Sequence, residues 1–82
     1  MRLSELAGKR IINLFDGELL GSVGDSDLLI DPDSGRIVEL LVPQGKGRRG
    51  SGRQLSVPWS AVKKIGSEIL VVEVEDNYSY YR

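Results

Sequence analysis

Tight turns recur along this 82-residue chain at intervals that leave little room between strands for a helix. Asp16-Gly17, residues 31–35 (DPDSG) and Gly66-Ser67 each combine residues that adopt positive φ, fix φ or bond to nearby backbone. Parallel strands joined by a crossover helix need a connection of a dozen residues or more. The chain is therefore expected to fold mainly as antiparallel hairpins.

Apolar residues between these turns follow the alternation of pleated strands. Residues 9–15 alternate between two faces, and residues 36–42 are apolar on both faces and should be the most buried. Gly21 and Gly24 interrupt the segment after the first turn and predict bulges. Trp59 follows Pro58 at a strand exit and is expected to pack over the core.

These signals together predict an all-β fold, a small closed β-barrel of five to six mostly antiparallel strands with short helical turns. The expected domain spans residues 1–76, and residues 77–82 are expected to form a C-terminal tail. A barrel of this size fills its interior with its own side chains, so no substrate cleft is expected.

Composition removes several classes of chemistry. The chain has no cysteine and no histidine, which excludes thiol nucleophiles, imidazole bases and the usual zinc ligands. The segment that starts at Asp31 and continues through Asp33 lacks the glutamate that a calcium loop would place at Val42. We expect no enzyme activity, no metal site and no cofactor.

No apolar run reaches the roughly 18 to 20 residues of a membrane helix, so no membrane association and a cytoplasmic location are expected.

A glycine-rich basic segment, residues 45–53 (GKGRRGSGR), contains a literal G-x-G-x-x-G. No helix is expected after it, so the segment does not fit a dinucleotide-binding loop. Two interpretations stay open. The segment is either a solvated connection between strands or a contact for an anionic partner, whether RNA or an acidic protein, through four cations: Lys46, Arg48, Arg49 and Arg53.

Charge is unevenly distributed, although the net charge is only -1. Residues 16–33 carry six acids and no Lys or Arg, whereas residues 44–64 carry six cations and no acid. This asymmetry either marks an interaction surface or lets two ends of one small domain attract each other.

The order of the motifs resembles the PRC-barrel domain family. LSELAGKRIIN, DGELLGSVGDSDLLID, DSGRIVELLV and VPWSAVKKIGSEILVV carry the resemblance and together span residues 3–74. Within that family, the short length and the last motif are similar to the YlmC/YmxH sporulation family. The resemblance implies a cytoplasmic, non-enzymatic PRC-type barrel that serves as a docking or assembly module.

The expected function is therefore that of a protein-interaction module without catalytic residues. It is expected to form a homodimer and to bind a further protein partner, which the sequence does not identify. Residues expected in apolar contacts are those of the exposed half of the last strand and the tyrosines near the C-terminus: Ile69, Val71, Tyr78, Tyr80 and Tyr81. The alternative is an RNA- or ribosome-associated accessory protein that binds through the basic glycine-rich segment.

Overall fold

The architecture comes from a computed structural model, which describes residues 1–44 and 54–75 and the backbone of residues 79–81. These residues form one α-helix, two 3₁₀ turns and eight strands. In chain order they are α1 (Leu3–Ala7), β1 (Arg10–Asn13), β2 (Leu19–Ser22), η1 (Val23–Asp25), β3 (Asp27–Ile30), β4 (Ile37–Pro43), β5 (Gln54–Pro58), η2 (Trp59–Ala61), β6 (Val62–Ile65), β7 (Ile69–Val72) and β8 (Ser79–Tyr81).

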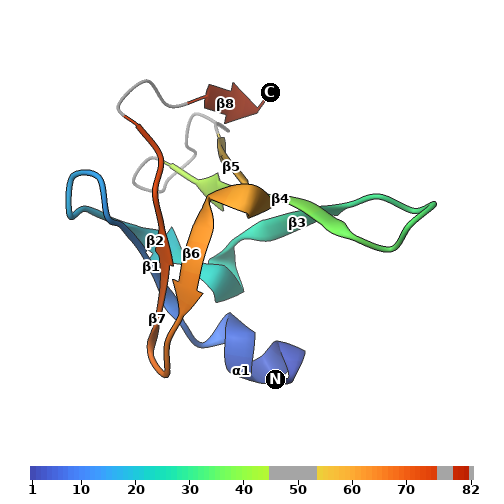
Figure 1. Cartoon of the computed structure of the whole chain (residues 1–82), viewed down its shortest axis with the longest axis horizontal. Coiled ribbons are helices and arrows are strands. Elements are labelled where there is room, and N and C mark those ends of the chain that lie inside the picture. Colours follow the sequence, from blue (N-terminus) through green and yellow to red (C-terminus); the bar gives the residue numbers. More distant parts are fainter. Residues whose placement is uncertain (45–53, 76–78, 82) are drawn as a thin grey trace.

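The strands form two four-stranded sheets with the orders β2-β1-β7-β6 and β3-β4-β5-β8 (Figure 1). The expected all-β class is confirmed, and all described strand pairs are antiparallel except β1 and β7, which are parallel. Two expectations are wrong. The described sheets do not join into a closed cylinder, and there are eight described strands rather than five or six.

The additional strands arise mainly where the chain leaves the first sheet. The segment after the Asp16-Gly17 turn does not continue as one strand, because η1 divides it into β2 and β3. These two strands then belong to different sheets. The turn at η1 therefore moves the chain from one layer to the other, and β3 becomes the edge of the second sheet.

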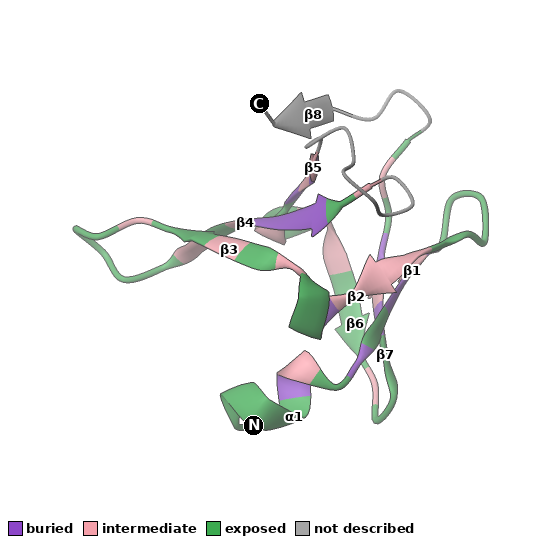
Figure 2. Ribbon diagram, turned by 180° about the vertical axis from the view of Figure 1, so that it is seen from behind, coloured by how far each residue is buried: buried purple, intermediate pink, exposed green. Residues whose placement is uncertain are grey.

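The core lies between the two sheets and is closed at one end by α1 (Figure 2). Its buried side chains alternate along β1, β5 and β7, as the sequence predicted for Leu70 and Val72. Trp59 packs against this core, as expected. The buried apolar residues of the cluster are Leu6, Ile11, Val23, Leu40, Val42, Leu55, Val57, Leu70 and Val72.

The two glycines that predicted bulges have different roles. Gly21 has φ 153° and lies beside a register shift between β1 and β2, so the predicted bulge is confirmed. Gly24 lies in η1 rather than in a strand, so a strand bulge there is wrong. A Cβ at Gly24 would come 2.8 Å from the carbonyl oxygen of Ala7, which shows that this position must be small to let α1 approach.

The hairpin of β3 and β4 projects away from the rest of the molecule (Figure 1). Its tip is the predicted turn at residues 31–35, closed by hydrogen bonds from the backbone N–H of Asp31 to the Arg36 carbonyl and of Gly35 to the Asp31 carbonyl.

Within the part of the chain that the structure describes, no helix has the length and apolar character that a membrane-spanning helix needs.

Candidate interaction surface

The β2-β1-β7-β6 sheet carries apolar side chains on the side turned away from the core, which we call the outer face. Ile11, Leu70 and Val72 are fully buried and point to the core, so their strand neighbours point outward. The strand register places Ile12 beside Val71 on β7 and beside Leu19 on β2. A row of apolar residues, Leu19, Ile12 and Val71, therefore crosses three strands.

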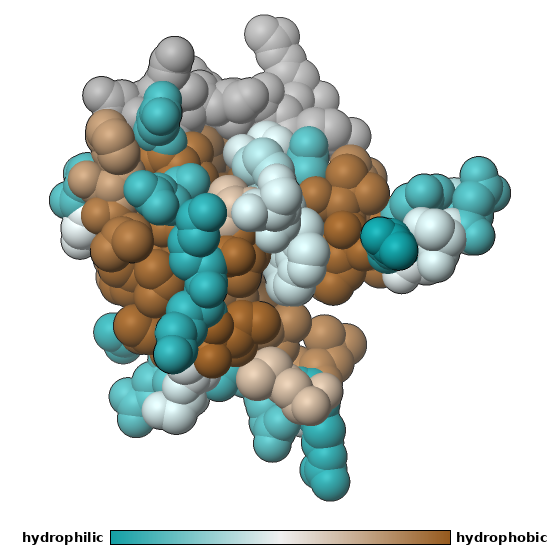
Figure 3. Space-filling model, viewed as in Figure 1, coloured by the Kyte–Doolittle hydropathy of each residue, from teal (hydrophilic) through white to brown (hydrophobic). Residues whose placement is uncertain are grey.

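Exposure along the outer face is high for apolar residues. Leu19 is 57% exposed and Ile69 is 39% exposed, while Ile12 and Val71 are half-buried. Figure 3 shows apolar side chains gathered over the part of the molecule that contains β6 and β7, with hydrophilic side chains crossing them. The outer face therefore offers an apolar surface held in place by regular strand pairing.

Cations border the apolar row. The register pairs Lys64 with Val71 and Arg10 with Ile69, so both cations lie on the outer face, and both are exposed. Lys63 is the residue skipped at the register shift between β6 and β7 and is also exposed. Glu73 follows β7 as an exposed acid. Among these four residues, three are cationic and one is acidic.

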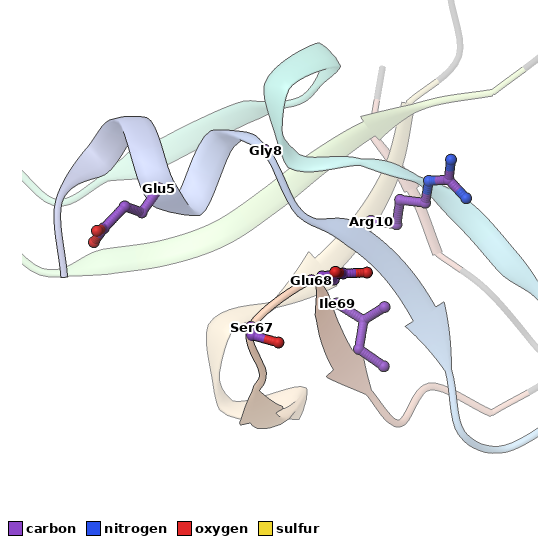
Figure 4. A pocket seen from close by; sticks show the side chains of 6 residues that line it. All are labelled: Glu5, Gly8, Arg10, Ser67, Glu68 and Ile69. Carbon is purple, nitrogen blue, oxygen red and sulfur yellow. The ribbon is translucent and has the colours of Figure 1, made fainter.

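An open groove lies between α1 and the β6–β7 hairpin (Figure 4). It has a volume of about 440 Å³ and is lined by Glu5, Gly8, Arg10, Ser67, Glu68 and Ile69. In Figure 4 the charged ends of Glu5 and Arg10 point in opposite directions. The polar groups of a small-molecule site converge on one position, and the side chains of these two residues do not.

Among the described residues, no group of three or more acidic residues, histidines or cysteines lies close enough together to hold a metal ion.

A family model described as PRC-barrel domain matches residues 1–78. The chain belongs to the PRC-barrel domain family. It is 42% identical over 78 residues to a Bacillus subtilis (strain 168) protein named "Uncharacterized protein YmxH", covering 93% of this chain and 92% of that relative. It is also 31% identical over 80 residues to the "Probable sporulation protein YlmC" of the same strain, covering 94% of this chain and 96% of the relative. The resemblance expected from the motifs is thereby confirmed.

The candidate residues fall in several places in this PRC-barrel domain. Ile69 and Val71 lie on the outer face, where the alternation of the last long strand predicted them. The backbone of Tyr80 pairs with Leu55 in the other sheet, and that of Tyr81 pairs with Gln54. The structure therefore does not place these tyrosines in the same sheet as Ile69 and Val71. Five further candidates lie outside the described residues: Lys46, Arg48, Arg49, Arg53 and Tyr78.

Sequence reasoning missed the contribution of Ile12 and Leu19 to the outer face. Both lie in segments that were expected as strands, and each is apolar at an outward position. What could not be anticipated is that β1 pairs in parallel with β7, which brings Ile12 against Val71 from the far end of the chain. The only sequence signal was the apolar character of both faces near residue 12.

Lys9 is a buried cation, directly before β1, that forms hydrogen bonds to the turn of the β6–β7 hairpin. Its Nζ donates hydrogen bonds to the carbonyl oxygens of Gly66, at 2.6 Å, and Ser67, at 2.9 Å. The side chain is only 5% exposed. It therefore satisfies two carbonyl groups of the turn that would otherwise depend on water.

Replacing Lys9 by methionine keeps the apolar stem but removes both hydrogen bonds. We expect the free energy of unfolding to fall by about 1.5 kcal/mol, because water can reach the exposed turn and replace part of what is lost. Urea denaturation measures the change. Lys63→Met, at an exposed lysine of β6, is the matched control and should leave the midpoint within error; equal effects of the two variants would contradict a role for the Lys9 hydrogen bonds.

Proposed function

We propose that this PRC-barrel protein is a non-enzymatic interaction module that associates with a second copy of itself through the outer face. The observation that supports the proposal best is the apolar row of Leu19, Ile12 and Val71, presented on a paired sheet whose other side is already occupied by the core. The backbone of paired strands is already ordered, so binding requires no further backbone ordering, which favours a preformed docking surface.

The composition of the outer face fits protein association better than catalysis. Apolar residues at the centre and charged residues around them are the usual arrangement of a protein interface. Contiguous exposed apolar surface on a small domain is costly in water and commonly marks such a contact. We also propose a cytoplasmic location and a part in sporulation; the part in sporulation is supported by the name of the YlmC relative.

Ile69→Glu tests the proposal. Ile69 is exposed, so the substitution should not disturb folding, but it places a charge where the contact must exclude water. We expect the self-association constant to fall by at least about tenfold, corresponding to roughly 1.4 kcal/mol. Sedimentation velocity across a concentration series up to high micromolar measures it.

Leu3→Glu is the matched control, since Leu3 is 71% exposed on α1 and lies outside the outer face. It should associate like the unmodified protein. A protein that stays strictly monomeric at high micromolar concentration, or an Ile69→Glu variant that associates normally, would overturn the proposal.

A further inference from the structure

The β3–β4 hairpin extends beyond the core, and its outer part carries apolar side chains that the core does not cover. Leu28 pairs with Leu40 and both face the core, where Leu40 is fully buried. The next pair on the same side of the ribbon is Ile30 with Ile37. Ile30 is 50% exposed, and Val38, the residue skipped at the register shift, is 42% exposed. We call residues 29–38 the arm.

The arm is organised before it binds anything. The Asp31 carboxylate accepts hydrogen bonds from the backbone N–H of Asp33 and from the hydroxyl of Ser34, and the Ser34 hydroxyl accepts one from the Arg36 backbone. A two-stranded ribbon alone is only marginally stable in water. Here the hydrogen-bonded tip and the attachment of β4 within the second sheet hold it, so little ordering cost remains for a docking event.

The charges on the arm and on the outer face determine which surface the arm can bind. The arm carries Asp31 and Asp33 against one cation, Arg36, and two further aspartates precede it, Asp25 in η1 and Asp27 in β3. The outer face and its edges carry Arg10, Lys63 and Lys64 against Glu73 and Glu68, of which Glu68 lies beside Arg10 and Ile69 in the groove. The arm is therefore net acidic and the outer face net basic, so the charges favour a contact between an arm and an outer face over a contact between two like surfaces.

We propose that the arm of one copy docks on the outer face of another. The inference rests on the proposed function and names the partner of its docking surface. Ile30 and Val38 meet the apolar row, and the aspartates of the arm lie near Lys63 and Lys64. Because the arm projects from the second sheet, on the side of the molecule opposite β1 and β7 (Figures 1 and 2), the contact is head-to-tail. Each pair keeps one free arm and one free outer face, so association continues beyond two copies unless a ring closes.

A mixing experiment separates this arrangement from a symmetric contact between two outer faces. Ile30→Glu removes the arm as a docking element and leaves the outer face intact; Ile69→Glu does the reverse. Each variant alone should be monomeric by sedimentation velocity at high micromolar concentration. An equimolar mixture should form a one-to-one complex that grows no further, because the single intact arm meets the single intact outer face.

Four outcomes of the experiment are informative. Rescue on mixing supports the inference. If Ile69→Glu abolishes association while Ile30→Glu associates normally, the proposed function stands and the arm is not the occupant. A mixture that stays monomeric also overturns the inference. If Ile69→Glu itself associates normally, the proposed function is wrong, and the inference that rests on it is wrong as well. Thermal melting of each variant alone confirms that both remain folded.

Charge exchange supplies a second test that leaves the apolar residues unchanged. Asp33→Lys and Lys64→Glu should each weaken association by about two- to fivefold at low salt, the size expected of exposed ion pairs. Both substitutions in one chain should restore the association constant toward the unmodified value, because the two charges are then exchanged and still attract each other. Additive weakening in the double variant would contradict the arm-to-face contact.

Discussion

Replacing Asn13 with leucine is expected to lower the free energy of unfolding by about 3 kcal/mol, although leucine is apolar and the site is fully buried. The Asn13 amide nitrogen donates to the Val74 carbonyl at 2.9 Å, and its oxygen accepts from the Val74 N–H at 3.0 Å. The same oxygen accepts from the Phe15 N–H at 3.2 Å. Leucine leaves these partly buried backbone groups without that partner, and an unsatisfied group costs up to about 1 to 3 kcal/mol when it is fully buried.

The reason for an amide at this position is the geometry of the β1–β7 pair. Backbone pairing runs from Arg10 beside Ile69 to Asn13 beside Val72. Beyond Val72, the Asn13 side chain takes the place of a backbone partner for Val74, bonding to both its N–H and its carbonyl. The side chain thus extends the contact of the two strands past the last backbone pair.

Asn13→Asp distinguishes hydrogen bonding from packing, because the two side chains have nearly the same shape. An ionised carboxylate can still accept from the Val74 N–H but faces the Val74 carbonyl without a proton to donate. Burial and that carbonyl should raise the pKa of the introduced carboxyl in the folded state above its unfolded value of about 3.9. The folded state then binds the proton more tightly, so the loss of stability is smallest below about pH 4 and grows until the pH passes the folded-state pKa.

Urea denaturation at several pH values measures both variants against the unmodified protein. Asn13→Leu should show a loss that varies little with pH, and Asn13→Asp a loss that increases with pH. A leucine variant as stable as the unmodified protein would show that the Asn13 hydrogen bonds contribute nothing net.

Local features of this fold could be predicted because they depend on neighbours in the sequence. The turns at Asp16-Gly17 and Gly66-Ser67 join antiparallel strands as expected, and Gly17 has φ 73°. The alternation of Leu70 and Val72 with Ile69 and Val71 assigned the core side and the outer side of β7 correctly. Such patterns follow from the period of two along a strand.

Features that depend on distant parts of the chain could not be predicted in the same way. The parallel pairing of β1 with β7 joins residues about sixty positions apart, and no turn signal connects them. It nevertheless decides which apolar residues form the outer face, because it brings Ile12 to Val71. The division between two open sheets depends on η1, where the sequence indicated only a glycine in a strand.

Gly24→Ala is expected to lower the free energy of unfolding by about 2 to 3 kcal/mol, the cost of overpacking against atoms that cannot move aside. The new Cβ would lie 2.8 Å from the Ala7 carbonyl oxygen and 3.7 Å from its carbonyl carbon. Both are backbone atoms of α1, which is anchored by the buried Leu6. Relief therefore requires α1 to shift and expose part of the core.

Two other glycines are matched controls that separate crowding from backbone conformation. At Gly8, φ is -80° and a Cβ would lie 3.8 Å from the nearest atom, the Glu5 carbonyl oxygen, so Gly8→Ala should be neutral or slightly stabilising. At Gly17, a Cβ meets nothing within 4 Å but φ is 73°, so Gly17→Ala should cost only about 1 kcal/mol. Thermal and urea unfolding of the three variants should rank Gly24→Ala as the most destabilised. If Gly17→Ala is instead the worst, backbone conformation outweighs the close approach of α1 to η1, and the requirement for a small residue at position 24 is wrong.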